Sequence, residues 1–221
     1  MKVAAKIAIT VTILLLTGCT NTADKGEELN YIRADLQEIN TTLDSLTTSK
    51  YEILEQIEIN RLAPYFSIVD AIRKNVNDGY TTKDVVFALD RAYSKYGLWM
   101  HGFTLDDWFA QAKLESERFD CRALSHVGAR GLVQVMPSTA AWLNRIHFKI
   151  DNFSDELLYN PYICAEFGAY YMKMLLSEYK DKEIALEAYN GGPGNIGIVA
   201  TQQYRITVLN ISRSYLQKRG K

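Results

Sequence analysis

The chain is poor in the residues that build metal and nucleic-acid sites. It has three histidines, three cysteines and a formal net charge of −1 over 221 residues. His101, His126 and His147 lack the spacing of a ligand set, and Cys121 and Cys164 do not form a short pair. A net charge near zero gives no electrostatic footprint for nucleic acid. We therefore expect no metal, no cofactor and no nucleic-acid partner.

The apolar run at the start of the chain is too short to cross a membrane. Residues 7–16 are apolar apart from threonines, whereas a spanning helix needs ~20 apolar residues. Lys2 and Lys6 precede this run, and a basic start before a short apolar stretch is typical of a secretory signal. The sequence therefore predicts export.

The signal ends in a segment that indicates lipid attachment. Residues 16–19, Leu-Thr-Gly-Cys, resemble the bacterial lipobox, in which the cysteine is diacylated and becomes the new N-terminus. We predict a lipoprotein signal peptide over residues 1–18 and a palmitate-bearing anchor at Cys19, because several acyl chains hold a protein stably on a membrane. Thr20 is not the aspartate associated with inner-membrane retention, so resemblance to such lipoproteins implies the periplasmic face of the outer membrane. The alternative is an ordinary signal peptide with a chance cysteine.

Export also leaves two states open for Cys121 and Cys164. An oxidising compartment favours a disulfide. The sequence cannot show whether the two residues are close enough to bridge, so a pair of free thiols is equally consistent with it.

Apolar residues after the tether recur at steps of three and four. They are Leu29, Ile32, Leu36, Ile39, Leu43 and Leu46. This is the a/d pattern of a helix that faces a partner. Two interpretations stay open, a helix packed on its own domain and a stalk that self-associates through residues 29–46.

The rest of the chain is predicted to be mainly α-helical. Helical patterns cover about 51–62, 64–75, 82–96, 105–116, 137–143, 160–178, 182–189 and 202–217, with Pro64 interrupting the first two and Thr81 or Thr104 as caps. No sustained period-two alternation indicates strands. We assign residues 19–100 to a tether and N-terminal helical region, and residues 101–221 to a second domain.

Three segments of the second domain form a set. They are Lys113–Phe119, Ser125–Ala140 and Ala188–Ile196. In order and spacing they resemble the catalytic domain of the soluble lytic transglycosylases, abbreviated SLT, and the resemblance runs from about Leu105 to Leu216. It implies the lysozyme-like fold shared with goose-type lysozyme, and peptidoglycan as the substrate.

Glu115 is the residue in these segments best suited to acid catalysis. Trp108, Phe109, Ala112 and Leu114 supply apolar neighbours, and an apolar site raises the pKa of a carboxyl group. Most glycosidases pair two carboxylates. The resemblance implies one glutamate instead, which protonates the leaving oxygen of the β-1,4 bond between N-acetylmuramic acid and N-acetylglucosamine. It then removes a proton from the C6 hydroxyl, which closes a 1,6-anhydro ring without water.

Other motif residues are expected to bind the glycan strand. Gly128 and Gly131 permit tight backbone turns beside the sugar. The expected sugar contacts are hydrogen bonds from Ser125 and Gln134, an apolar floor at Met136, the Tyr189 hydroxyl directed at the glutamate or an N-acetyl group, a loop beginning at Asn190, and Tyr204 along the groove.

Two departures from the family pattern affect these assignments. An extra residue lies between Glu115 and Phe119, so Glu117 is the alternative acid. Ala200 stands where the family usually has glutamate, which puts local substrate contacts in doubt.

Two other functions fit the same residues. A goose-type-lysozyme-like hydrolase would share the fold and the acid but release a reducing end. A non-catalytic peptidoglycan-binding lipoprotein would share the groove alone.

Overall fold

The computed structural model describes residues 24–219, so the predicted signal peptide and Cys19 lie outside the described residues. The chain divides into two compact units, residues 1–61 and residues 62–221. The described part of the first unit is a stretch of helix α2, which runs from Asp24 to Arg73. No helix in the described part is long and apolar enough to span a membrane.

The expected break at Pro64 is wrong, because α2 continues through this residue. Proline removes one amide donor, which leaves the carbonyl four residues earlier, at Asn60, without its helical partner. Asn60 is exposed, so water can satisfy that carbonyl. Tyr65 and Val69 on the far side are buried, and their packing favours continuation of the helix.

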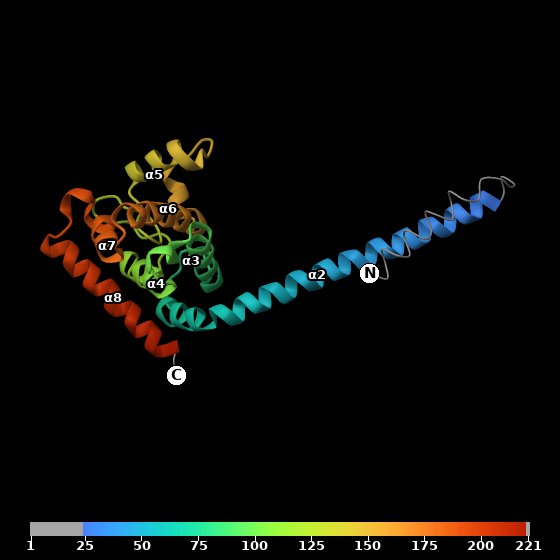
Figure 1. The fold of residues 1–221 in the computed structure, drawn as a ribbon, viewed down its shortest axis with the longest axis horizontal. Helices are drawn as coiled ribbons and strands as arrows, with labels where there is room; N and C mark the ends of the chain where they lie inside the picture. Colours follow the sequence, from blue (N-terminus) through green and yellow to red (C-terminus); the bar gives the residue numbers. More distant parts are fainter. Residues whose placement is uncertain (1–23, 220–221) are drawn as a thin grey trace. The chain divides into compact units, whose positions relative to one another are not determined.

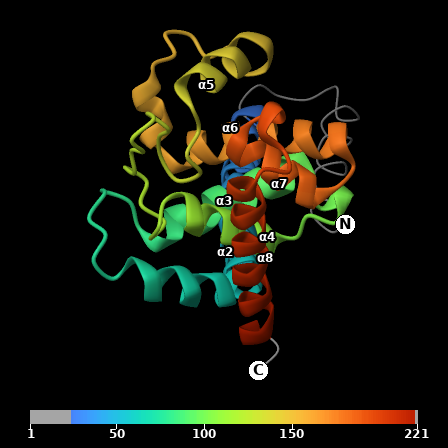
Figure 2. The same cartoon turned by 90° about the vertical axis from the view of Figure 1, so that its left-hand side faces the viewer.

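The second unit is built from helices, as predicted. After α2 come α3 (Thr82–Tyr96), η1 (Leu98–His101), α4 (Leu105–Glu115), α5 (Pro137–Leu143), η2 (Asn144–Phe148), η3 (Asp155–Tyr159), α6 (Pro161–Tyr179), α7 (Lys182–Gly191), η4 (Pro193–Asn195) and α8 (Val199–Arg219). Residues 24–219 contain no strand, only two isolated antiparallel bridges that join Leu124 and Val135 to Arg130. Figures 1 and 2 show α3 beside α6, and α8 alongside α4 and α7.

Local capping explains where the helices begin. Thr81 caps α3, and Thr104 caps α4, each in a reciprocal capping box with the aspartate three residues later. Both caps match the sequence prediction. They satisfy amides that a helix leaves without partners in its first turn.

Asp107 ties the start of α4 to two later helices. Its carboxylate accepts hydrogen bonds from Lys182 Nζ at 2.9 Å and from Ser212 Oγ at 2.7 Å. These contacts join α4 to the first residue of α7 and to α8. The register of α4 against α8 is therefore set by a buried polar contact as well as by apolar packing.

A buried ion pair holds the loop that follows α4. Arg73 at the end of α2 donates to both carboxylate oxygens of Asp78, at 2.8 and 3.1 Å, and to the Phe119 carbonyl. Asp78 also accepts the Cys121 amide at 2.8 Å. Burial opposes ionisation of Asp78, but these hydrogen bonds outweigh it and lower the pKa of the carboxyl group. The loop after residue 115 is thus anchored on a charged, fully bonded pair.

Candidate active site

Glu115 is the last residue of α4 and is partly buried. Trp108, Phe109 and Ala112 of the same helix are fully buried, as the apolar pattern predicts. Burial raises the pKa of Glu115 to about 7, against an opposing hydrogen bond from Tyr204. A carboxyl group with this pKa exchanges a proton readily near neutral pH.

Tyr204 is the direct partner of that carboxyl group. Its hydroxyl, on the second turn of α8, donates to Glu115 Oε1 at 2.5 Å. Burial, and next the charge of Glu115, raise the pKa of Tyr204, so the phenol stays protonated and remains a donor. A donor of this kind favours the carboxylate form and lowers the pKa that burial raises. The proton that Glu115 exchanges is thereby directed to its other oxygen, Oε2.

The extra residue after Glu115 lies in a tight turn. Glu117 and Phe119 both have left-handed backbone angles, φ 57° and 56°. Phe119 is fully buried, whereas the Glu117 side chain is exposed. Ser116 closes the helix by donating to the Ala112 carbonyl at 2.7 Å. The turn therefore absorbs the additional residue while the Glu115 side chain stays in the helical register.

The segment after this turn is held by its own polar groups. Ser125 Oγ accepts the Ala129 amide at 2.9 Å. Gln134, at φ 49°, donates from Nε2 to the carbonyls of Ala123 and Gly131 at 3.1 and 3.0 Å. The amide nitrogen of Gln134 thus holds the loop, and only Oε1 is left for the hydrogen bond to the sugar that was predicted for this residue.

The two glycines of this segment take left-handed angles for different reasons. At Gly128 (φ 91°) an added Cβ would meet no atom within 4 Å, so only the backbone angle favours glycine. At Gly131 (φ 77°) a Cβ would lie 2.0 Å from the Leu158 carbonyl oxygen. Close approach to the protein backbone, not to the sugar, therefore requires glycine at residue 131.

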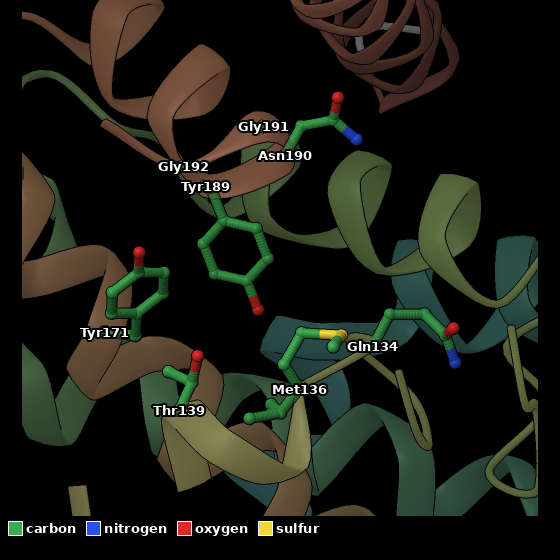
Figure 3. A pocket seen from close by; sticks show the side chains of 9 residues that line it. Gln134, Met136, Thr139, Tyr171, Tyr189, Asn190, Gly191 and Gly192 are labelled. Atoms are coloured by element: carbon green, nitrogen blue, oxygen red, sulfur yellow. The ribbon is translucent and has the colours of Figure 1, made fainter. Parts of the chain in front are cut away.

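A cavity of about 270 Å³ lies between the second and third motif segments. Four of the predicted binding residues line it: Gln134, Met136, Tyr189 and Asn190. The other lining residues are the loop glycines Gly191 and Gly192 together with Val135, Thr139 and Tyr171. Figure 3 shows Tyr189, Met136, Thr139 and Tyr171 around a common space, with the amides of Gln134 and Asn190 pointing away from it.

Glu115, Ser125 and Tyr204 do not line this cavity. Tyr189 links the two regions, since the charge of Glu115 contributes to raising the pKa of Tyr189 after the larger effect of burial. The Tyr189 hydroxyl donates to the Val133 carbonyl at 2.8 Å. Of the two partners expected for Tyr189, the glutamate is instead bonded by Tyr204, and the N-acetyl group stays a prediction. The cavity is thus a candidate ligand subsite, and Tyr189 is the residue that relates it to Glu115.

Three residues of the α4 helix and the cavity were not predicted as site residues, namely Gln111, Thr139 and Tyr171. Gln111 lies one helical turn before Glu115 and is fully buried. Its side chain lowers the pKa of Tyr204, although neither of its amide atoms has a well-aligned hydrogen bond within residues 24–219. A polar residue among Trp108, Phe109 and Ala112 was the available signal in the sequence. Thr139 and Tyr171 also line the cavity. Thr139 lies within the second motif segment, but no binding role was assigned to either residue.

A second ion-pair cluster orients the start of α8. Glu187, buried in α7, accepts the Gly197 amide at 2.7 Å and lies 3.1 Å from Arg205 Nε. Arg205 follows Tyr204 directly and also pairs with Glu183. Ala200, where the family usually has glutamate, is exposed one turn before Tyr204. These contacts hold the Tyr204 turn without a carboxylate at residue 200.

Cys121 and Cys164 are buried free thiols in the structure. Burial raises the pKa of the Cys164 thiol to about 12, so it stays protonated at neutral pH. Within the described residues, no cluster of three or more histidine, cysteine, aspartate or glutamate side chains is arranged to hold a metal ion.

Comparisons with known proteins identify the family and the fold of the chain. The family model named transglycosylase SLT domain matches residues 95–207, about half of the chain. An inactive glutamate-to-glutamine variant of lytic transglycosylase Slt from Pseudomonas aeruginosa is 27% identical, with a TM-score of 0.51 over 73% of this chain and 29% of that one. The 70-kDa soluble lytic transglycosylase of Escherichia coli is 22% identical, with a TM-score of 0.50 over 70% and 27%, and shows the fold alone.

This chain therefore spans less than a third of the length of either solved protein. The matches confirm the mainly α, lysozyme-like fold expected from the three motif segments.

Proposed function

The chain belongs to the transglycosylase SLT domain family, and from that premise we propose that it is a peptidoglycan lytic transglycosylase. The observation that carries the proposal is the environment of Glu115. Burial and the Tyr204 hydroxyl account for the pKa of about 7, and no second carboxylate in the described part contributes to it. A reaction that needs one residue as acid and then as base fits a group poised near neutral pH.

In the first step, protonated Glu115 donates from Oε2 to the glycosidic oxygen that leaves the anomeric carbon. The bond between the anomeric carbon and that oxygen breaks, and positive charge develops on the sugar ring. Tyr204 stabilises the carboxylate that forms, because its hydroxyl already donates to Oε1. A buried carboxylate next to the cationic ring is stabilised further by their opposite charges.

In the second step, the C6 hydroxyl of the muramoyl residue attacks its own anomeric carbon. Glu115 accepts the hydroxyl proton and returns to its starting state. The new bond closes the 1,6-anhydro ring, and no water is consumed. The inactive Slt variant carries glutamine in place of a glutamate, which supports dependence on one carboxyl group.

Apart from Tyr204, which contacts Glu115, the predicted binding residues divide into two groups under this proposal. Met136, Tyr189 and the loop from Asn190 form the cavity that receives a sugar ring or its N-acetyl group. Ser125 and Gln134 hold the shape of the backbone loop that follows Glu115, and their hydrogen bonds to the glycan strand stay a prediction. Peptidoglycan glycan strands are the partner that this arrangement suits.

We also propose that diacylated Cys19 anchors the protein to the outer membrane, facing the periplasm. Support comes from the lipobox-like residues 16–19 and from the absence of aspartate at residue 20. Membrane attachment would keep a wall-degrading enzyme within reach of the sacculus.

Product analysis tests the reaction. Digests of purified sacculi should yield muropeptides with 1,6-anhydro ends, which mass spectrometry detects because each is one water lighter than the hydrolytic product. Glu115→Gln should lower cleavage by at least about a thousandfold, because the amide can neither donate nor accept the transferred proton. Sacculus binding should stay near the wild-type level.

Glu117→Gln is the matched control, since it makes the same chemical change at an exposed residue two positions away. It should retain wild-type cleavage. Reducing ends alone would assign a goose-type-lysozyme-like hydrolase. Binding without cleavage would assign a peptidoglycan-binding lipoprotein, and loss of cleavage in Glu117→Gln alone would move the acid to Glu117.

A further inference from the structure

The first unit presents a long apolar face with no described segment of that unit to cover it. Its described residues, 24–61, all belong to helix α2, which Figure 1 draws from blue to cyan. Leu43, Leu46 and Ile53 on this face are 58%, 61% and 61% exposed. Exposed aliphatic side chains in a row along one helix face mark an interaction surface.

The structure lengthens the heptad pattern of this face. Because α2 runs unbroken past residue 46, the steps of three and four continue through Ile53 to Ile57. Every a and d position from Leu29 to Ile57 is apolar except Lys50. That is about four heptads, the length at which a sustained pattern favours a coiled coil over a helix packed on its own domain.

The middle of this helix needs packing to be stable. Residues 41–49 read Thr-Thr-Leu-Asp-Ser-Leu-Thr-Thr-Ser, and β-branched threonine and serine are weak helix formers. Hydroxyls such as those of Thr42 and Thr47 bond to the carbonyl one turn earlier, at 2.8 Å each, which does not offset that weakness. Since most of the stability of a helix in a protein comes from packing of its amphipathic face, burial of these apolar side chains against a partner would stabilise α2.

We propose that the partner is further copies of this chain, joined in a parallel, in-register coiled coil of three or four strands over residues 29–57. The a positions hold Leu29, Leu36 and Leu43, and the d positions hold mostly isoleucine, as at Ile32 and Ile39. Leucine at a with isoleucine at d favours three or four strands over two. In a parallel coiled coil of identical chains in register, each a or d residue packs against the same residue of the other copies, so each layer of the core contains one residue type.

The charges flanking the seam are compatible with this assembly. The e and g positions are mainly neutral, such as Asn40, Thr42 and Thr47, while acidic Glu38 and Asp44 lie at outward positions. Like charges therefore do not oppose each other across the seam. Lys50 occupies one a position, and a single polar residue there restricts register and strand number at a cost in stability.

The parallel orientation rests on the proposed anchor at Cys19, because chains tethered at their N-termini to one membrane run away from it in the same direction. The association itself rests only on α2. A failure of the assembly would therefore leave the proposed reaction untouched, and the reverse also holds.

Cysteine cross-linking of the full-length, membrane-anchored protein tests the register. Leu43→Cys puts a thiol at an a position, where copies in register bring identical residues together. Thr41→Cys, two residues away at an outward f position, is the matched control. Most of the Leu43→Cys protein should migrate as a disulfide-linked dimer on non-reducing gels, and Thr41→Cys should not, while buried Cys121 and Cys164 stay silent.

Sedimentation in density-matched detergent tests the number of strands. The wild-type protein should have the mass of three or four copies, and the double variant Leu36→Asp/Leu43→Asp should be a monomer that still cleaves sacculi. Thr41→Asp/Thr48→Asp, with the same carboxylates on the outward face, should remain assembled. A monomeric or dimeric wild-type protein, or equal cross-linking of Leu43→Cys and Thr41→Cys, would overturn the proposal.

Discussion

At the scale of single residues, the acidity of Glu115 is a balance between two opposed effects. Burial disfavours the carboxylate and raises the pKa, while the Tyr204 hydroxyl favours the carboxylate and lowers it. The resulting value of about 7 leaves the acid and base forms both populated near neutral pH. A group that serves first as acid and then as base needs such a balance.

The balance predicts a pH effect of Tyr204→Phe. The acid step requires protonated Glu115, so cleavage should fall as the pH rises through the pKa of this group. Removing the Tyr204 hydroxyl removes a bond that favours the carboxylate, so the pKa of Glu115 should rise above 7 and the alkaline limb should move to higher pH. Activity at the optimum should drop about tenfold, because the forming carboxylate loses its donor.

The measurement is the pH dependence of sacculus digestion for wild type and variant. Tyr189→Phe provides the comparison, since the Tyr189 hydroxyl donates to the Val133 carbonyl and not to Glu115. Its alkaline limb should coincide with that of the wild type even if its rate is lower. An alkaline limb that stays in place in Tyr204→Phe would contradict the assignment of Tyr204.

At the scale of elements, the site depends on a close contact between α6 and the second motif segment. Gly168 of α6 lies where a Cβ would be 2.5 Å from Val133 Cγ2 and 2.8 Å from the Tyr189 hydroxyl. Val133 supplies the carbonyl that Tyr189 binds. The absence of a side chain at Gly168 thus lets the helix approach the residues that orient Tyr189.

Gly168→Ala should therefore disturb both stability and activity. Overpacking of this kind costs roughly 1–3 kcal/mol in the free energy of unfolding, and displacement of Tyr189 should slow cleavage. Urea unfolding followed by tryptophan fluorescence measures the first effect. Gly194→Ala is the control, because Gly194 has no neighbouring atom within 4 Å of a Cβ position. Equal stability of the two variants would show that the contact is not tight.

At the scale of the whole molecule, the chain combines a family domain with a separate helical unit and a predicted lipid anchor. The family match begins at residue 95, whereas the second compact unit begins at Leu62. This unit therefore also contains the end of α2 and most of α3, which lie before the matched region. Glu115 and Tyr204, to which we assign the reaction, both lie in this second unit. The first unit contains the residues of the proposed coiled coil.

Attachment is tested at Cys19. Cys19→Ser should abolish incorporation of radiolabelled palmitate, because serine has no thiol to form the thioether. Thr20→Asp should keep the label but move the protein from the outer-membrane to the inner-membrane fraction. Labelling of Cys19→Ser equal to that of the wild type would refute the anchor.

The sequence determined the local features of this protein. Apolar periodicity and the caps Thr81 and Thr104 located the helices, because each depends on residues a few positions apart. The motif segments identified the family because each motif is a short run of neighbouring residues. The continuation of α2 through Pro64 escaped prediction, since burial of Tyr65 and Val69 by distant elements outweighs a local preference.

The tertiary structure alone decided which groups meet. Tyr204 is 89 residues from Glu115, and no local pattern connects them. The exposure of Glu117, the reason for glycine at residue 131 and the burial of the Gln111 amide are equally matters of packing between segments distant in the chain. The pKa of Glu115 follows from the same packing, because desolvation and a hydrogen bond depend on what surrounds a side chain, not on its neighbours in sequence.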